Sequence, residues 1–439
     1  MFKETSKELL DFLSKSPTAF HAVENYRQIL NADGFKELLE SEHWDIVPGG
    51  KYYVTRNNTS ILAFKVGTKL ENYSFNIVTS HTDSPTFKVK ENAEIEVKNK
   101  YTQLNTEGYG GMLCATWLDR PLSIAGRVLV SEGNSIVTKL LNIDRDLLMI
   151  PNVAIHMNRA ANDGFKYNLQ VDMLPLLSAG DDRQKDFKQI LADELGVKKE
   201  DILGHDLYLY NRMAPSIWGA NEEFISAGHL DDLQCGFASL KALLAGYNDE
   251  SIDIMACFDN EEVGSGTKQG ADSTLLRDTL TRINSALGKT EEDYHRALAS
   301  SFMLSSDNAH AVHPNHPEHT DATNCTYMNE GVVVKSHAGQ KYTSDGVSMA
   351  VVKALASGAD VPLQYFANRS DKAGGSTLGN IAMAQASMNA VDIGLPQLAM
   401  HSSYETAGIK DTYYAITLMK ALFDSHIQET STHSLEIKR

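Results

Sequence analysis

The chain has 439 residues, an apolar content of 42% and a formal net charge of -17. This length exceeds the size at which one hydrophobic core stops growing, so we expect two domains or one domain with a large insertion. The negative charge argues against nucleic-acid binding, which needs a surplus of Lys and Arg.

The N-terminal segment predicts a cytoplasmic protein. Its sequence, MFKETSKELLDFLSKSPTAFHAVENYRQIL, alternates charged and apolar residues at helical spacing and lacks the apolar core of a signal peptide. No run reaches the ~18 apolar residues of a membrane span, so we expect no membrane partner. The four cysteines are far apart in the sequence, and we expect buried free thiols.

The sequence pattern of the first 217 residues changes once, near residue 86. Residues 4–32 predict two helices separated at Ser16-Pro17, and strands are expected at 61–66 and 74–80. Residues 86–217 then show period-two alternation and short runs between turn residues, which predicts a β-rich insert with one helix over 185–196.

After Trp218, helical and buried strand patterns alternate, which predicts an α/β layer structure. The expected elements cover 231–246, 251–258, 271–286, 301–306, 345–357, 362–367, 376–390, 397–400 and 410–424. The tail after Ser425 is polar, and we expect it to be loosely ordered.

The strand at 251–258 leads into Asp259-Asn260 and then into two adjacent carboxylates, Glu261 and Glu262. Most Glu-Glu pairs are solvated surface. At a strand end, however, one carboxylate can bind a cation while the other carries a proton, which is the division between a metal ligand and a general base.

Four further ligand-type residues follow apolar strands or open a helix, and they are His81, Asp231, Asp307 and His401. Ligands of open α/β sheets gather outside the carboxyl ends of the strands, so these positions can converge on one crevice. A pair of zinc-like ions that share one carboxylate needs five such side chains, and one adjacent glutamate is then left as the base.

Each residue also has a structural interpretation. His81 and His401 could be packed polar core residues, Asp307 could cap a turn, and Asp231 or Asp232 could be the N-cap of the following helix. Coincidence at all five positions is much less probable than at one. Asp83 would lie on the same side of an extended segment as His81, as a residue that orients the imidazole or as a loop residue.

A rival metal site is the segment from Asp307 to His319, in which His310, His313, His316 and His319 recur every third residue. Two prolines forbid a continuous helix there. We therefore interpret it as a loop without a separate metal site.

Ordered motifs run through nearly the whole chain, namely SPTAFHAVENYRQIL, VTSHTDSP, GGMLCATWLDRPLSIAGRV, IPNVAIHMNR, GHLDDL, DNEEVGS, SSDNAHAVHPN, GQKYTSD, GGSTLGN and LPQLAMHS. In these motifs the chain resembles the aspartyl aminopeptidase family of dinuclear zinc exopeptidases. The resemblance implies an α/β/α metallopeptidase domain with a mixed central sheet, interrupted by a β-rich dimerisation domain. The implied parts are 1–86, 87–217 and 218–439, with the catalytic domain first and last.

The resemblance also implies site roles. Asp231 would bridge two zinc ions, which Co²⁺ or Mn²⁺ may replace, and Glu261 would be the general base. His81, Asp307 and His401 would be terminal ligands, with Glu262 as the remaining carboxylate ligand and Asp83 behind His81. His156 would reach the active site of a neighbouring subunit, in a homo-oligomer that is typically a tetrahedral dodecamer built from dimers.

The chain departs from the family near the substrate. Members that prefer Asp or Glu carry a lysine before a Gln-Arg-Tyr motif, where this chain has Gly339 before Gln340-Lys341-Tyr342. We expect Lys341, Tyr342 and Gly375 to contact substrate, with Lys341, Arg369 or Lys372 as replacement cations. The expected activity is removal of N-terminal residues from peptides, with acidic or neutral preference left open. The alternatives are another dinuclear-zinc amide hydrolase, such as a deacylase, and a non-catalytic self-assembling scaffold.

Overall fold

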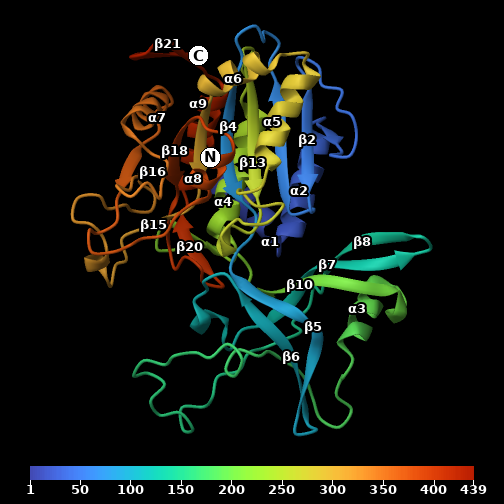
Figure 1. Ribbon diagram of the computed structural model, residues 1–439. Helices are drawn as coiled ribbons and strands as arrows, with labels where there is room; N and C mark the ends of the chain where they lie inside the picture. The colour runs from blue at the N-terminus through green and yellow to red at the C-terminus, as the bar shows by residue number, and fades with distance from the viewer.

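A nine-stranded mixed sheet forms the centre of the protein, whose computed structural model describes residues 1–439 (Figure 1). Its order is β1-β2-β3-β13-β4-β14-β18-β16-β17, and β13, β4, β14 and β18 run parallel. The strands span Lys36–Leu38 (β1), Lys51–Arg56 (β2), Ser60–Val66 (β3), Ser74–His81 (β4), Ser251–Phe258 (β13), Phe302–Ser306 (β14), Val332–Lys335 (β16), Leu363–Phe366 (β17) and Asn389–Gly394 (β18).

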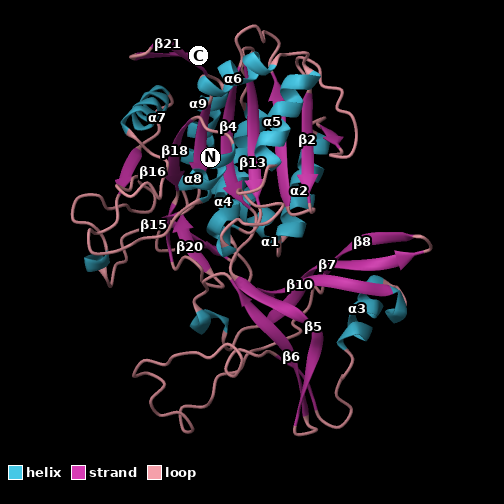
Figure 2. Ribbon diagram, viewed as in Figure 1, coloured by secondary structure: helices cyan, strands magenta, loops and turns pink.

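Helices cover both faces of this sheet (Figure 2). One face carries α1 (Phe2–Ser14), α2 (Ala19–Ala32), α4 (Leu230–Ala245), α7 (Gly346–Gly358) and α9 (Asp411–Phe423). The other carries α5 (Leu275–Ala286), α6 (Glu291–Ala299) and α8 (Leu378–Gln385). Successive side chains of a strand point to opposite faces, so β13 gives Met255 and Cys257 to the first core and Ile254 and Ala256 to the second. Burial on both faces explains why β13 is apolar throughout.

A second, antiparallel sheet is built only from residues 86–211 and lies below the central sheet in Figure 1. Its order is β8-β7-β10-β5-β6-β9. The strands span Thr86–Val97 (β5), Tyr101–Tyr109 (β6), Leu122–Glu132 (β7), Ser135–Asn142 (β8), Leu176–Ala179 (β9) and Ile202–Asn211 (β10), with α3 at Phe187–Leu195. It has its own core, in which Phe87 and Trp117 pack edge to face. The use of this part in dimerisation, and the three-part division, remain predictions.

Two smaller sheets complete the fold. A five-stranded sheet has the order β11-β12-β20-β19-β15, and the C-terminal residues form a hairpin. These strands span Ser216–Trp218 (β11), Phe224–Ala227 (β12), Ala309–His310 (β15), Pro396–Leu398 (β19), Glu405–Gly408 (β20), His426–Ser431 (β21) and Ser434–Lys438 (β22). None of the helices is both long and apolar enough to cross a membrane.

The predicted α/β class with a mixed central sheet is confirmed, but two local expectations were wrong. The helix expected over 376–390 ends at Gln385, and the residues after it begin β18, a strand inside the central sheet. The strand expected before His401 is present as β19, which belongs to the five-stranded sheet. The tail expected to be loosely ordered pairs as β21 and β22, with Ile427 buried.

Candidate metal centre

Three neighbouring parallel strands end at one edge of the central sheet and supply most of the predicted site. His81 is the last residue of β4, Glu261 and Glu262 follow β13 in a short 3-10 turn, and Asp307 follows β14. Because β13, β4 and β14 are adjacent and parallel, their carboxyl ends meet. The convergence predicted for these four side chains is therefore observed.

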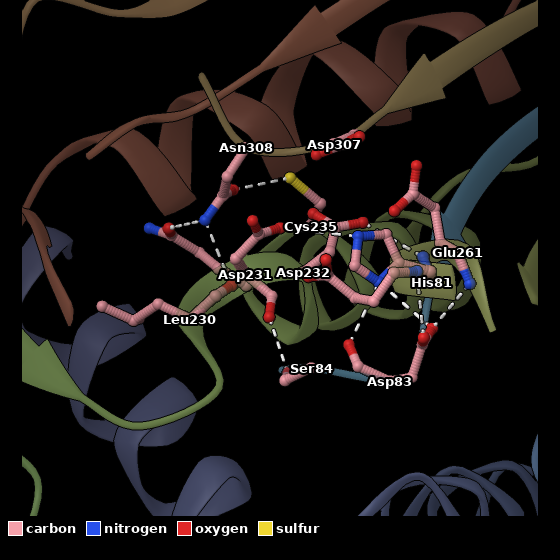
Figure 3. Close-up of polar contacts among 12 residues, drawn as sticks. His81, Asp83, Ser84, Leu230, Asp231, Asp232, Cys235, Glu261, Asp307 and Asn308 are labelled. Carbon is pink, nitrogen blue, oxygen red and sulfur yellow. Dashed lines mark hydrogen bonds and ion pairs between the residues drawn. The ribbon is translucent and has the colours of Figure 1, made fainter. Parts of the chain in front are cut away.

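Asp231 belongs to two groups of ligand-type atoms, and Figure 3 shows the one that it forms with His81, Asp232 and Asp307. Its Oδ1 is 3.5 Å from His81 Nε2, and its Oδ2 is 3.5 Å from Nε2 of His401. The first group combines Asp231 with His81, Asp307 and Asp232, and the second combines it with Glu262 and His401. Ligand atoms within each group lie within 4.8 Å of one another, so one carboxylate is common to two sets of potential ligands.

The geometry bears on whether Asp231 and Asp232 are potential metal ligands or helix caps. Both aspartates have non-helical backbone angles at a kink near the start of α4, and neither carboxylate accepts a hydrogen bond from a backbone N–H of that helix, so neither acts as a helix cap. Asp232 belongs to the first group only, and its Oδ2 accepts a hydrogen bond from the backbone N–H of His81 at 3.1 Å. Only Asp231 contacts both histidines.

The donor atoms fit divalent cations of the zinc type. Asp231 Oδ1, Asp232 Oδ1 and Glu262 Oε1 are buried and have no hydrogen-bond partner. Burying ionised carboxylates without a counter-charge is expensive, because their hydration is lost and they repel one another. Histidine nitrogen and carboxylate oxygen are common zinc ligands, and two ions can share one carboxylate. Cations bound to both groups would satisfy the unpaired oxygens.

The raised pKa values of Glu261 and His401 reflect the same excess of negative charge. Burial, together with the nearby carboxylates of Asp307, Asp83 and Asp231, raises the pKa of Glu261 to about 8, although His81 opposes the shift. Burial lowers the pKa of His401, but Asp231 and Glu262 outweigh burial and raise that pKa to about 10. A positive charge bound here would relieve both shifts.

Asp83 connects His81 with the two glutamates. Its carboxylate is 3.5 Å from His81 Nδ1, and its backbone oxygen is 3.1 Å from the same nitrogen. The carboxylate also accepts hydrogen bonds from the backbone N–H groups of Glu261, at 3.1 Å, and Glu262, at 3.2 Å. A fourth contact comes from the six-stranded sheet, because the Tyr109 hydroxyl of β6 donates to Asp83 at 2.7 Å.

Three supporting residues were missed by the sequence reasoning. Glu405 accepts hydrogen bonds from the backbone N–H groups of Asp231 and His401, and Tyr109 fixes Asp83. Lys335 is buried at the end of β16, where Nζ donates to the Asn308 backbone oxygen at 2.7 Å and lies 3.9 Å from Asp307. A lysine that ends the apolar run Val332-Val333-Val334 was the one signal in the sequence.

The centre opens into a cavity of about 220 Å³. Beyond the metal-type ligands, its walls include Lys335, Tyr342, Gly375, Thr377 and Met400. Lys335 Nζ also lies 5.7 Å from the centre of the Tyr342 ring. Tyr342 and Gly375 therefore lie where substrate contacts were predicted.

Two predicted residues do not reach the cavity of this chain. Lys341 Nζ donates to the backbone oxygens of Ala373, at 3.1 Å, and Gly374, at 3.3 Å, and so anchors the loop before Gly375. His156 lies in an exposed segment of the β-rich part, between β8 and β9. Its predicted role requires a second subunit.

Parallel strands that end in a mixed set of histidine and carboxylate ligands are typical of one class of protein, the metal-dependent α/β hydrolases. Residues 12–423 match the family model of the aminopeptidase I zinc metalloproteases, M18. A probable M18 family aminopeptidase 2 from Clostridium novyi (strain NT) is 48% identical over 425 residues, which cover 95% of this chain and 98% of the relative. The chain therefore belongs to the M18 family and is a zinc metallo-aminopeptidase.

Solved structures share the fold. A chain in the cryo-EM structure of the Ape4 and Nbr1 complex superposes with a TM-score of 0.92 at 35% identity, over 96% of this chain and 86% of that chain. The S. cerevisiae mApe1 dodecamer gives a TM-score of 0.84 at 28% identity, over 96% of this chain and 97% of that chain. The predicted family and enzyme class are thus confirmed.

Proposed function

We propose that this aminopeptidase hydrolyses the N-terminal peptide bond at a dinuclear zinc centre whose shared ligand is Asp231. The observation that carries the proposal is the contact of Asp231 with both His81 and His401, at 3.5 Å each. His81 and Asp307 would complete one zinc site, and Glu262 and His401 the other. Bound zinc would supply Lewis acidity and a more acidic water, and Co²⁺ or Mn²⁺ would serve as substitutes.

Glu261 is the proposed general base. Its carboxylate lines the cavity and approaches His81 and Glu262, but it belongs to neither group that contains Asp231. It would take a proton from the attacking water and deliver it to the nitrogen of the leaving amine. Asp83 would keep His81 oriented and, through the backbone of Glu261, place that base.

The test is Glu261→Gln, which keeps the side-chain size and removes the base. We expect kcat to fall by at least about 100-fold, the range of general-base catalysis, while zinc content stays near that of the parent enzyme. Metal analysis and turnover of an aminoacyl-anilide are measured on the same sample. Retained turnover would show that Glu261 is not the base. Loss of zinc from the variant would show instead that Glu261 is a metal ligand.

The proposed substrate preference is for neutral rather than acidic N-terminal residues. Lys335 is the one lysine or arginine in the cavity wall, and the Asn308 carbonyl and Asp307 already engage its charge. Lys341 is held by backbone carbonyls, and Arg369 pairs with Asp371. Lys372 is exposed and is not among the lining residues, so a substrate carboxylate would meet no unengaged cation in the cavity wall.

A panel of Asp, Glu, Leu and Met anilides tests this preference, and N-acylated amino acids are included as deacylase substrates. Higher kcat/KM for Leu and Met supports the proposal. Preference for Asp and Glu would contradict it, and turnover of the N-acylated compounds would favour the alternative deacylase.

The proposed assembly is a homo-oligomer, a tetrahedral dodecamer built from dimers, in which His156 of one subunit completes the site of another. The exposed segment around His156 presents the apolar side chains of Val153, Ile155 and Met157 to solvent in the isolated chain. Such side chains favour an interface. Mass measurement of the native particle and His156→Ala, which would lower kcat in the intact oligomer, test this arrangement.

A further inference from the structure

The loop after β15 brings three potential metal ligands together on the surface, apart from the centre at Asp231. They are His316, Glu318 and His319, whose ligand atoms all lie within 4.8 Å of one another. His316 Nδ1 is 3.1 Å from Glu318 Oε1. The spacing alone did not favour a separate site in this segment, because its prolines exclude a long helix.

Local backbone structure explains the grouping. The backbone N–H of His316 donates to the oxygen of His313, and that of His319 donates to the oxygen of His316. The first bond closes a turn at 314–315, and the second closes the turn that contains the 3-10 residues Pro317–His319, so two tight turns follow one another. These turns bring the rings of His313, His316 and His319 next to one another, with centroids 5.4 and 5.5 Å apart and ring planes tilted by 36° and 31°.

The prolines support this arrangement instead of opposing it. Pro317 is the first residue of the 3-10 turn Pro317–His319, where its missing N–H costs no hydrogen bond. The turn places Glu318 next to His316. Arg369 pairs with Asp371 and not with the Glu318 carboxylate, so that carboxylate has no cationic side chain as a competing partner.

We propose that His316, Glu318 and His319 bind a third divalent transition-metal ion, of the Zn²⁺ class. Two imidazoles and one carboxylate form a ligand set that zinc uses, with a fourth position left to water. All three side chains are exposed, so the ion would exchange with solvent. This site and the dinuclear centre share no residue.

The site has a structural connection to the cavity. Arg369 donates to the backbone oxygen of Glu318, and it belongs to the segment that continues to Gly375 and Thr377 in the cavity wall. A metal ion that fixes the 3-10 turn would therefore also restrict residues 367–377. We expect the bound ion to order the rim of the cavity and to leave the chemical step unchanged.

The experiment counts zinc on tag-free oligomer by equilibrium dialysis and metal analysis. The His316→Ala/His319→Ala double variant should bind one equivalent per chain less than the parent protein at saturating zinc. His295→Ala is the matched control, because His295 is also exposed and lies 3.8 Å from one glutamate, Glu291, without a second histidine. Equal zinc content in parent and double variant, or an equal loss in the control, would overturn the site.

Hydrogen exchange provides a second measurement that does not depend on activity. Added zinc should protect the amides of residues 313–320 and 367–377 in the parent, but not in Glu318→Gln or in the double variant. The double variant should retain the parental kcat when zinc is in excess. Zinc-dependent protection that persists in both variants would contradict the proposed ligands.

Discussion

The Glu405 carboxylate accepts a hydrogen bond from the backbone N–H of Asp231 through Oε2, at 3.0 Å, and its Oε1 holds the backbone N–H of His401 at 2.8 Å. One buried side chain thus fixes two segments that are 170 residues apart and that both supply proposed zinc ligands. Supporting contacts of this kind are commonly as important to a metal site as the ligands.

Glu405→Gln should weaken zinc binding. The amide group of Gln would place N–H donors against one of the two backbone N–H groups, so Asp231 or His401 would lose its anchor. We expect a 10- to 100-fold loss of zinc affinity, the range for residues behind metal ligands, measured by competition with a chelator. Glu429→Gln, an exposed glutamate in the C-terminal hairpin, is the control and should leave affinity unchanged.

Tyr109→Phe should lower activity without loss of metal. The Tyr109 hydroxyl donates to Asp83 and accepts from the Asn260 side chain, so the variant removes one donor from a carboxylate that orients His81. A hydrogen bond to a charged group is worth about 1.5–3 kcal/mol, and we expect a fall in kcat/KM of about tenfold. Tyr101→Phe, on the same strand but half-exposed, should have no effect.

Asp392→Asn should raise KM more than it lowers kcat. Asp392 accepts from the Ser305 and Thr377 hydroxyls and from the backbone and hydroxyl of Thr343, and it thereby holds the segments that carry Gly375 and Tyr342. The amide would oppose at least one of these donors, at a cost of about 1–3 kcal/mol. Steady-state kinetics and a melting curve measure the two effects. A melting shift with unchanged KM would restrict Asp392 to a structural role.

Asp411 should produce a pH-dependent loss of stability. Burial raises its pKa to about 7, although the backbone N–H groups of Asn329 and Gly331 oppose the shift. The folded state then binds the proton more tightly than the unfolded state. Its contribution is full below the unfolded pKa of about 3.9 and falls as pH rises to about 7, by up to about 1.4 kcal/mol per pH unit.

Asp411→Asn removes this titration. The melting temperature of the variant should therefore rise relative to that of the parent between about pH 5 and about pH 7. The difference between the two should become constant above that range. Calorimetry of both proteins over this range checks the sign. A constant difference would show that Asp411 remains ionised in the folded protein.

Sequence reasoning succeeded where a signal was local. The strand β4 ends in His81, and β13 is followed within four residues by Glu261 and Glu262, so strand and site appear in one stretch. It failed at β18, because a short apolar run after a helical pattern reads equally well as more helix. Glu405 could not be predicted as a support, because its partner Asp231 is 174 residues away and nothing near Glu405 marks the contact.

The order of the proposed ligands along the chain bears on biosynthesis. His81 precedes the whole six-stranded sheet, whereas His401 comes within the last tenth of the sequence. A polypeptide still emerging from the ribosome would thus hold only part of the donor set until nearly all of it had been translated. Zinc acquisition would be a late event of maturation, and truncated products would lack a complete hydrolytic centre.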